Sequence, residues 1–124
     1  NQVLELIGSK EGISHLHAPD LRLLSAVFSQ AAVHLGNDSG VKHVAAASGL
    51  PTVTLFGPED PSEWHVYPQD RHPLFYLPGL PCRKDAPAGS PARCVLEECT
   101  IEKHRCMVEI SPAEVYPACR KVMK

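Results

Sequence analysis

A short polar turn near the middle of the chain has the residue types of an anion-binding site. Asn37, Asp38, Ser39 and Gly40 follow a mostly apolar run and precede an alanine-rich stretch. A strand that ends in such a turn and passes into a helix points backbone N–H groups and the positive end of the helix dipole at one place. We therefore expect the amides of Asp38, Ser39 and Gly40 to bind an anion, most simply a phosphate.

Side chains of the turn and of the helix after it narrow the choice of ligand. The Asp38 carboxylate would repel a bare phosphate, but it suits a ligand with hydroxyl donors beside its phosphate, as in a sugar phosphate. The Ser39 hydroxyl can cap the helix or bond a phosphate oxygen, and a protonated His43 would add positive charge. Plainer interpretations stay open, because Asn-Asp-Ser-Gly is also an ordinary capping turn and a single histidine is more often structural. For Lys42 we favour a solvated helix residue over a phosphate contact.

Five cysteines lie between residues 82 and 119, and no two of them form a C-x-x-C pair. Cys119 falls on the apolar face of a predicted helix and is expected in the core. For the other four we favour reduced thiols without a metal, and a zinc site, with or without His104 in place of one cysteine, is the less favoured alternative. Disulfides would need an oxidising compartment that nothing else in the sequence supports. These four residues are Cys82, Cys94, Cys99 and Cys106.

The composition limits the class of protein in which these residues can lie. The chain has 124 residues, 44% hydrophobic and 21% charged, which suits one soluble globular domain and argues against disorder. The net charge is −2 with scattered lysines and arginines, so a nucleic-acid partner is not expected. No apolar run is long enough to cross a bilayer. The first residue is not Met, and we interpret the chain as part of a longer protein.

Alternating strand and helix signals in the first half predict an α/β fold, a Rossmann-like parallel sheet with flanking helices. Asp20 is a suitable N-cap for the first helix, and Gly49 suits the left-handed residue that ends the second. An apolar run at 3–7 is a strand or the end of a helix. The predicted order is strand 13–17, helix 21–30, strand 32–35, helix 40–48 and strand 52–56.

The second half of the chain is rich in proline and cysteine. Eight of the 12 prolines lie between Pro58 and Pro91, so we expect residues 58–110 to be a Pro- and Cys-rich loop region with a short strand at 74–77. Ser111, followed by Pro and then Glu at the third helical position, forms a capping box and predicts a terminal helix over 111–123.

The central block resembles glycosyltransferase family 9, the bacterial heptosyltransferases that build the lipopolysaccharide inner core. The likeness covers nearly all of residues 13–123. Its start, Asp20-Leu21-x-x-Leu24, and its end, Cys106-Met107-x-x-Ile110-Ser111-Pro112-x-x-Val115, also look like this family's C-terminal half. The specific part is Asn37-Asp38-Ser39-Gly40-x-x-His43-x-Ala45-Ala46-Ala47-x-Gly49-x-Pro51-Thr52-Val53-x-Leu55-Phe56-Gly57-Pro58-x-Asp60-Pro61.

The resemblance implies the donor-binding, C-terminal half of a GT-B fold, which holds an ADP-heptose or similar nucleotide-sugar. Asp38 would bind sugar hydroxyls, Ser39 and Gly40 the diphosphate, and His43 would sit beside the leaving phosphate or the acceptor. The turn at Pro19 would contact the adenine, and Trp64 either lines the donor cleft or packs under its loop.

The resemblance also bounds what this chain does by itself. It implies no metal or other cofactor, a lipopolysaccharide core acceptor, and a cytoplasmic enzyme that is peripheral on the inner membrane. The catalytic base is expected in an N-terminal domain outside this chain, so residues 1–124 form a single partial domain without turnover of its own. The alternatives are a non-catalytic α/β module that binds a nucleotide or sugar phosphate, and a structural subdomain with a Cys-rich zinc segment.

Overall fold

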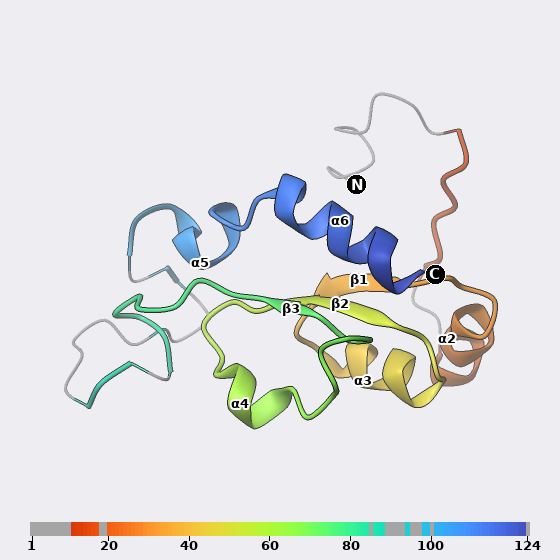
Figure 1. Cartoon of the computed structure of the whole chain (residues 1–124), viewed down its shortest axis with the longest axis horizontal. Helices are drawn as coiled ribbons and strands as arrows, with labels where there is room; N and C mark the ends of the chain where they lie inside the picture. Colours follow the sequence, from red (N-terminus) through yellow and green to blue (C-terminus); the bar gives the residue numbers. More distant parts are fainter. Residues whose placement is uncertain are drawn as a thin grey trace.

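A three-stranded parallel sheet forms the centre of the protein (Figure 1). The computed structural model describes residues 11–17, 20–84, 86–88, 94, 98–99 and 101–123. The strands are β1 (His34–Asn37), β2 (Thr52–Leu55) and β3 (Leu74–Phe75), in the order β1-β2-β3. The central strand β2 is rich in β-branched residues and buried over its first three positions, as a strand covered on both faces requires.

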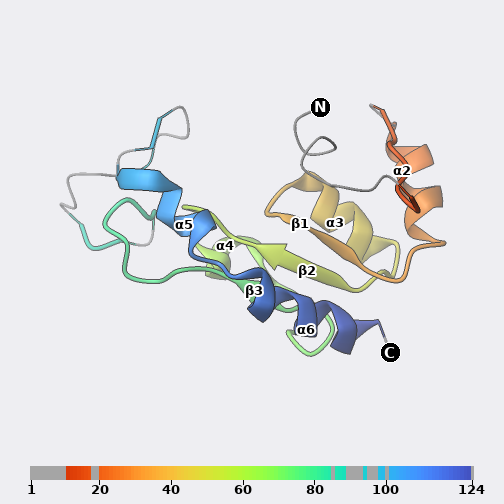
Figure 2. The ribbon, with the colours of Figure 1, turned by 90° about the horizontal axis from the view of Figure 1, so that it is seen from above.

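Helices cover both faces of this sheet. On one face lie α2 (Leu21–Phe28) and α3 (Gly40–Ala47), which are side by side in both views (Figure 1, Figure 2). On the other face lies α6 (Pro112–Val122) (Figure 1). The α/β prediction with a Rossmann-like parallel sheet is confirmed by this arrangement.

Each layer has its own apolar core. Phe28, Ala45 and Leu50 join α2 to α3, whereas Val53 of β2 packs against α6. Cys119 of α6 is 7% exposed and belongs to this second core, as predicted.

The predicted helix ends that depend on neighbouring residues in the sequence are confirmed. The Asp20 carboxylate accepts a hydrogen bond from the Leu23 amide at the start of α2, at 2.8 Å. Ser111 and Glu114 form the predicted capping box of α6, and Gly49 has a φ of +79° at the end of α3. Asp20, Ser111 and Gly49 therefore fix helix ends by contacts within a few residues.

Several predicted boundaries in the first half are wrong. No strand exists over 13–17, where every side chain is exposed, because no described segment pairs with it. Helix α2 ends at residue 28 rather than 30. Strand β1 occupies 34–37 rather than 32–35, because its register with β2 runs from His34–Thr52 to Asn37–Leu55. The apolar run at 3–7 lies outside the described residues.

The expected loop region at 58–110 contains short helices that the sequence analysis missed. Helix α4 (Pro61–Trp64) starts at Asp60, whose carboxylate accepts from the Ser62 amide, a signal that was present in the sequence. A 3₁₀ turn, η1 (Glu102–His104), leads into α5 (Arg105–Val108). Strand β3 is two residues long rather than four, because β2 ends beside it at Leu55. No helix in the described part of the chain has the length and apolar character needed to span a membrane.

Candidate functional site

The predicted site residues meet at the carboxyl end of β1, where the chain passes into α3. Asp38, Ser39, Gly40 and His43 line a pocket of about 330 Å³, which we call the turn pocket. Two residues from the segment after β2, Glu59 and Trp64, complete its lining. Trp64 is 50% exposed and thus lines the pocket rather than packing beneath a loop. Pro19, the predicted adenine contact, lies outside the described residues.

The backbone of the turn differs from expectation at one amide. The Asp38 N–H donates to the Leu55 carbonyl at 3.0 Å, so it belongs to the sheet and does not point at a ligand. The prediction that this amide binds an anion is therefore wrong. The amides of Ser39 and Gly40 stand at the start of α3, before its first intrahelical hydrogen bond, from Lys42 N–H to the Ser39 carbonyl.

Ser39 and Gly40 leave this helix start open. Ser39 occupies the N-cap position, but its hydroxyl makes no capping hydrogen bond in the helix. A Cβ built on Gly40 would meet no described atom within 4 Å. Of the two roles predicted for the Ser39 hydroxyl, capping is thus not used here. A ligand can approach the first turn of α3 closely.

Lys42 is the largest departure from the sequence-based expectation, because it is fully buried. Its ammonium donates to Asp38 Oδ1 at 2.6 Å and to the Trp64 carbonyl at 2.8 Å. The same nitrogen lies 4.8 Å from the centre of the Phe56 ring. The prediction of a solvated residue is wrong, because the end of α4 covers this face of α3.

The Lys42 ammonium changes the electrostatics of the turn. The Asp38 side chain is 14% exposed and pairs with the Lys42 ammonium, whose charge is equal and opposite. The pair is therefore close to neutral, and the repulsion that Asp38 would exert on an anionic ligand is largely offset. A carboxylate and an anion can thus share one pocket.

His43 is held by a partner inside the fold. Its Nδ1 lies 2.6 Å from the Tyr67 hydroxyl, so any ligand contact from this ring has to come from Nε2. Tyr67 also packs against His65 and His72, with ring centres 5.6 and 5.2 Å away. Burial lowers the pKa of His65 and of His72, and the nearby charge of Lys42 lowers that of His65 further. The His43 ring can therefore have a structural role through Nδ1 and still line the turn pocket.

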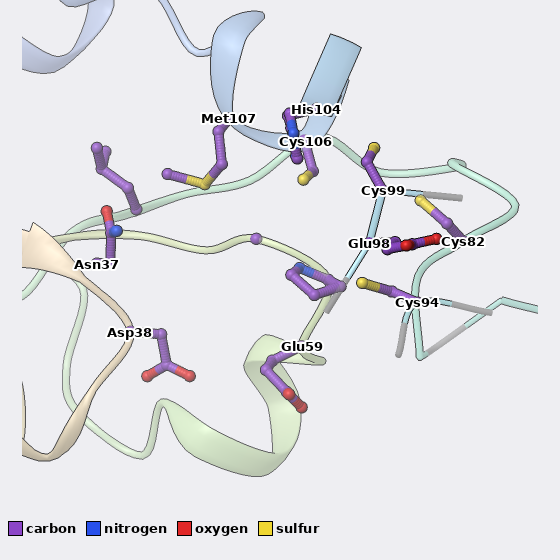
Figure 3. A pocket seen from close by; sticks show the side chains of 13 residues that line it. Asn37, Asp38, Glu59, Cys82, Cys94, Glu98, Cys99, His104, Cys106 and Met107 are labelled. Carbon is purple, nitrogen blue, oxygen red and sulfur yellow. The ribbon is translucent and has the colours of Figure 1, made fainter. Parts of the chain in front are cut away.

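A second cavity of about 390 Å³ adjoins the turn pocket, and we call it the cysteine cavity (Figure 3). Asp38 and Glu59 line both spaces. Among the described side chains no group of three His, Cys, Asp or Glu is arranged to hold a metal ion as it stands. The cysteine cavity is lined by Asn37, Asp38, Leu55, Gly57, Pro58, Glu59, Cys82, Cys94, Glu98, Cys99, His104, Cys106 and Met107.

The thiols of this cavity form no disulfide. Burial raises the pKa of Cys82 and of Cys106, and the proximity of the other cysteines of the cavity raises both pKa values further. A thiol with a raised pKa is a weak nucleophile at neutral pH, so Cys82 and Cys106 are not poised for nucleophilic catalysis.

Arg83 is a site-forming residue that the sequence analysis missed. Its guanidinium is 1% exposed and donates to the carbonyls of Gly57 and Glu59, each at 2.8 Å. It also lies 4.7 Å from the centre of the Tyr76 ring. Arg83 therefore fixes the segment after β2 that lines both spaces. No pattern in the sequence distinguishes it from a surface arginine.

A three-stranded parallel sheet with flanking helices, and with a pocket where β1 ends, defines a Rossmann-like α/β domain. Residues 12–95 match the sequence profile of glycosyltransferase family 9 (heptosyltransferase), and the chain belongs to that family. It is similar to lipooligosaccharide heptosyltransferase 2 of Campylobacter jejuni, with 26% identity over 88 residues. That match covers 71% of this chain and 24% of the relative, so the chain spans about a quarter of it. No solved structure gives a significant match.

Proposed function

We propose that this chain is the donor-binding part of a glycosyltransferase that moves a heptose, or a related sugar, from an ADP-sugar to a lipopolysaccharide core acceptor. The observation that carries the proposal is the buried Asp38–Lys42 pair beside the open start of α3. In one pocket, the helix start would hold a diphosphate while the carboxylate accepts hydrogen bonds from hydroxyls.

The diphosphate and the sugar of a nucleotide-sugar would each have a partner in the turn pocket. The Ser39 and Gly40 amides and the α3 dipole would stabilise the diphosphate, including the charge that develops as it leaves. Asp38, neutralised by Lys42, would accept hydrogen bonds from the sugar hydroxyls. His43 would act through Nε2, beside the leaving phosphate or the acceptor. This chemistry needs no metal in the reaction, because fixed dipoles and cations stabilise the departing anion.

The rest of the reaction is assigned to parts outside this chain. Residues 1–124 are proposed to be a single partial domain, the C-terminal half of a GT-B fold. The catalytic base and the acceptor site would belong to the other half, so the chain by itself is not expected to turn over. We propose a cytoplasmic enzyme, peripheral on the inner membrane, where a lipopolysaccharide acceptor is presented.

Calorimetric titration of the full-length protein with ADP-heptose and with ADP tests the proposal. Asp38→Asn removes the charge and one of the two acceptor oxygens, and it should weaken ADP-heptose binding by roughly ten-fold or more and ADP binding much less. Glu63→Gln, on the exposed face of α4, is the matched control and should change neither. Equal losses for both ligands would refute the sugar contact. Absence of binding to the wild-type protein would refute the donor site itself.

Binding without transfer would favour the alternative of a non-catalytic nucleotide- or sugar-phosphate module. The two are separated by incubating the full-length protein with ADP-heptose and a core acceptor and measuring ADP release. Acceptor-dependent release supports the transferase, whereas tight donor binding with no release supports the module.

A further inference from the structure

Four cysteines that are spread over 25 residues of sequence line one cavity (Figure 3). Cys82 and Cys94 are adjacent in space, because the Cys94 amide donates to the Cys82 carbonyl at 2.8 Å. Cys99 lies on the same side, and Cys106 enters from α5. Spacing alone could not establish this convergence, because it depends on how the chain folds between these residues.

Ordinary core packing does not account for this grouping. Cys119 gives the comparison within the same chain, because it is buried between apolar side chains of β2 and α6. In contrast, Cys94, Cys99 and Cys106 are partly exposed and face a cavity. Thiols form only weak hydrogen bonds, so clustering four of them around a cavity gives little stability by itself.

The described part of the segment that carries the cysteines is held at its start by Arg83 and Lys84, and regular secondary structure does not support the rest of it. Between β3 and η1 the described residues contain no helix or strand. A bound metal ion often supplies the folding energy of such a segment, and four cysteine thiolates are a complete ligand set for structural zinc.

We propose that Cys82, Cys94, Cys99 and Cys106 bind one Zn²⁺ as a structural tetrathiolate site that fastens these four positions to one another beside the turn pocket. Four Zn–S bonds form, and the four thiols release their protons to solvent. The described thiols are free and do not yet converge on one point, and the Cys99 thiol donates to the Ile101 carbonyl. Rotation about one χ1 angle moves a cysteine sulfur by about 3 Å, and the proposed site requires such turns to bring the four sulfurs to one point.

Metal analysis of the full-length protein, purified under reducing conditions and equilibrated with buffered Zn²⁺, tests the site. We expect about one zinc per chain, and Co²⁺ substitution should give the absorption of a tetrahedral thiolate site. Cys94→Ser and Cys99→Ser should each lower zinc affinity at least ten-fold. Cys119→Ser and His104→Ala are the matched controls and should retain zinc, because neither removes a proposed ligand.

Each outcome of these experiments either supports or overturns the zinc site. Less than about 0.1 zinc per chain in the wild-type protein, an iron–sulfur chromophore, or unchanged affinity in both ligand variants would overturn the proposal. Circular dichroism of each variant at saturating zinc distinguishes loss of a ligand from loss of the fold, since a folded variant with weak binding supports the site. The result does not depend on donor binding, so it stands or falls separately from the proposed transferase.

Discussion

Replacing Lys42 with Met is the sharpest test of how the turn is built. Met keeps the length and apolar stem of the side chain but removes the ammonium. The loss leaves the largely buried Asp38 carboxylate without its cation and takes one donor from the Trp64 carbonyl. Because the Lys42 side chain is 0% exposed, water cannot replace either contact at that position.

The expected cost follows from this geometry. Two unit charges about 4 Å apart attract by about 4 kcal/mol at the effective dielectric typical of partly buried pairs. Removing one partner of a buried ion pair typically costs 3–5 kcal/mol. We therefore expect Lys42→Met to lower the free energy of unfolding by about 3–5 kcal/mol. Asp38→Asn should cost less, because the amide oxygen can still accept from the ammonium.

Urea unfolding of the chain, followed by the fluorescence of Trp64, its one tryptophan, measures this cost. Lys121→Met, in the exposed last turn of α6, is the control and should stay within about 0.5 kcal/mol of wild type. The double variant Asp38→Leu with Lys42→Met should cost at least about 2 kcal/mol less than the sum of its single changes. A cost for Lys42→Met below about 1 kcal/mol, or additive changes, would refute the buried pair.

Two further predictions concern groups around the site. Burial lowers the pKa of His34, His65 and His72 below the ordinary value of 6.5, so just below that pH the unfolded chain binds more protons than the folded chain. Stability should fall as the pH drops from 6.5 toward the folded pKa values, and equal urea midpoints at about pH 7.5 and 5.5 would contradict this. Arg83→Met should cost about 2–4 kcal/mol, because two carbonyls lose their buried donor. Its urea midpoint is compared with that of Arg105→Met, on an exposed side chain, and equal shifts would contradict the role of Arg83.

The parts of the fold that the sequence predicts well depend on neighbours in the sequence. The ends of α6 and α3 follow from Ser111 and Gly49, whose contacts lie within a few residues. The strand at 13–17 failed for the opposite reason, since alternation gives a strand only where another strand accepts its hydrogen bonds. Short α4 was missed because its proline-rich surroundings outweighed the capping signal of Asp60.

The residues of the candidate site also differ in whether the sequence could predict their place. The cluster of Asp38, Ser39 and Gly40 could be predicted, because these residues are consecutive. The burial of Lys42 could not, because it depends on the Trp64 carbonyl, which is 22 residues away in the sequence. A lysine on a helix carries no mark of whether another element will cover it.

The cysteine cavity and the turn pocket share a wall, which is the segment after β2. Arg83, the residue next to Cys82, holds the carbonyls of Gly57 and Glu59, and the Lys84 amide donates to the Pro58 carbonyl at 2.9 Å. The Glu59 side chain, which lines both spaces, pairs with Lys84. This wall of the turn pocket is therefore fastened from the cysteine segment as well as from the sheet. A zinc ion at the cysteines would act on ligand binding through Glu59, while the α3 amides, which depend on β1 and β2, would keep their positions.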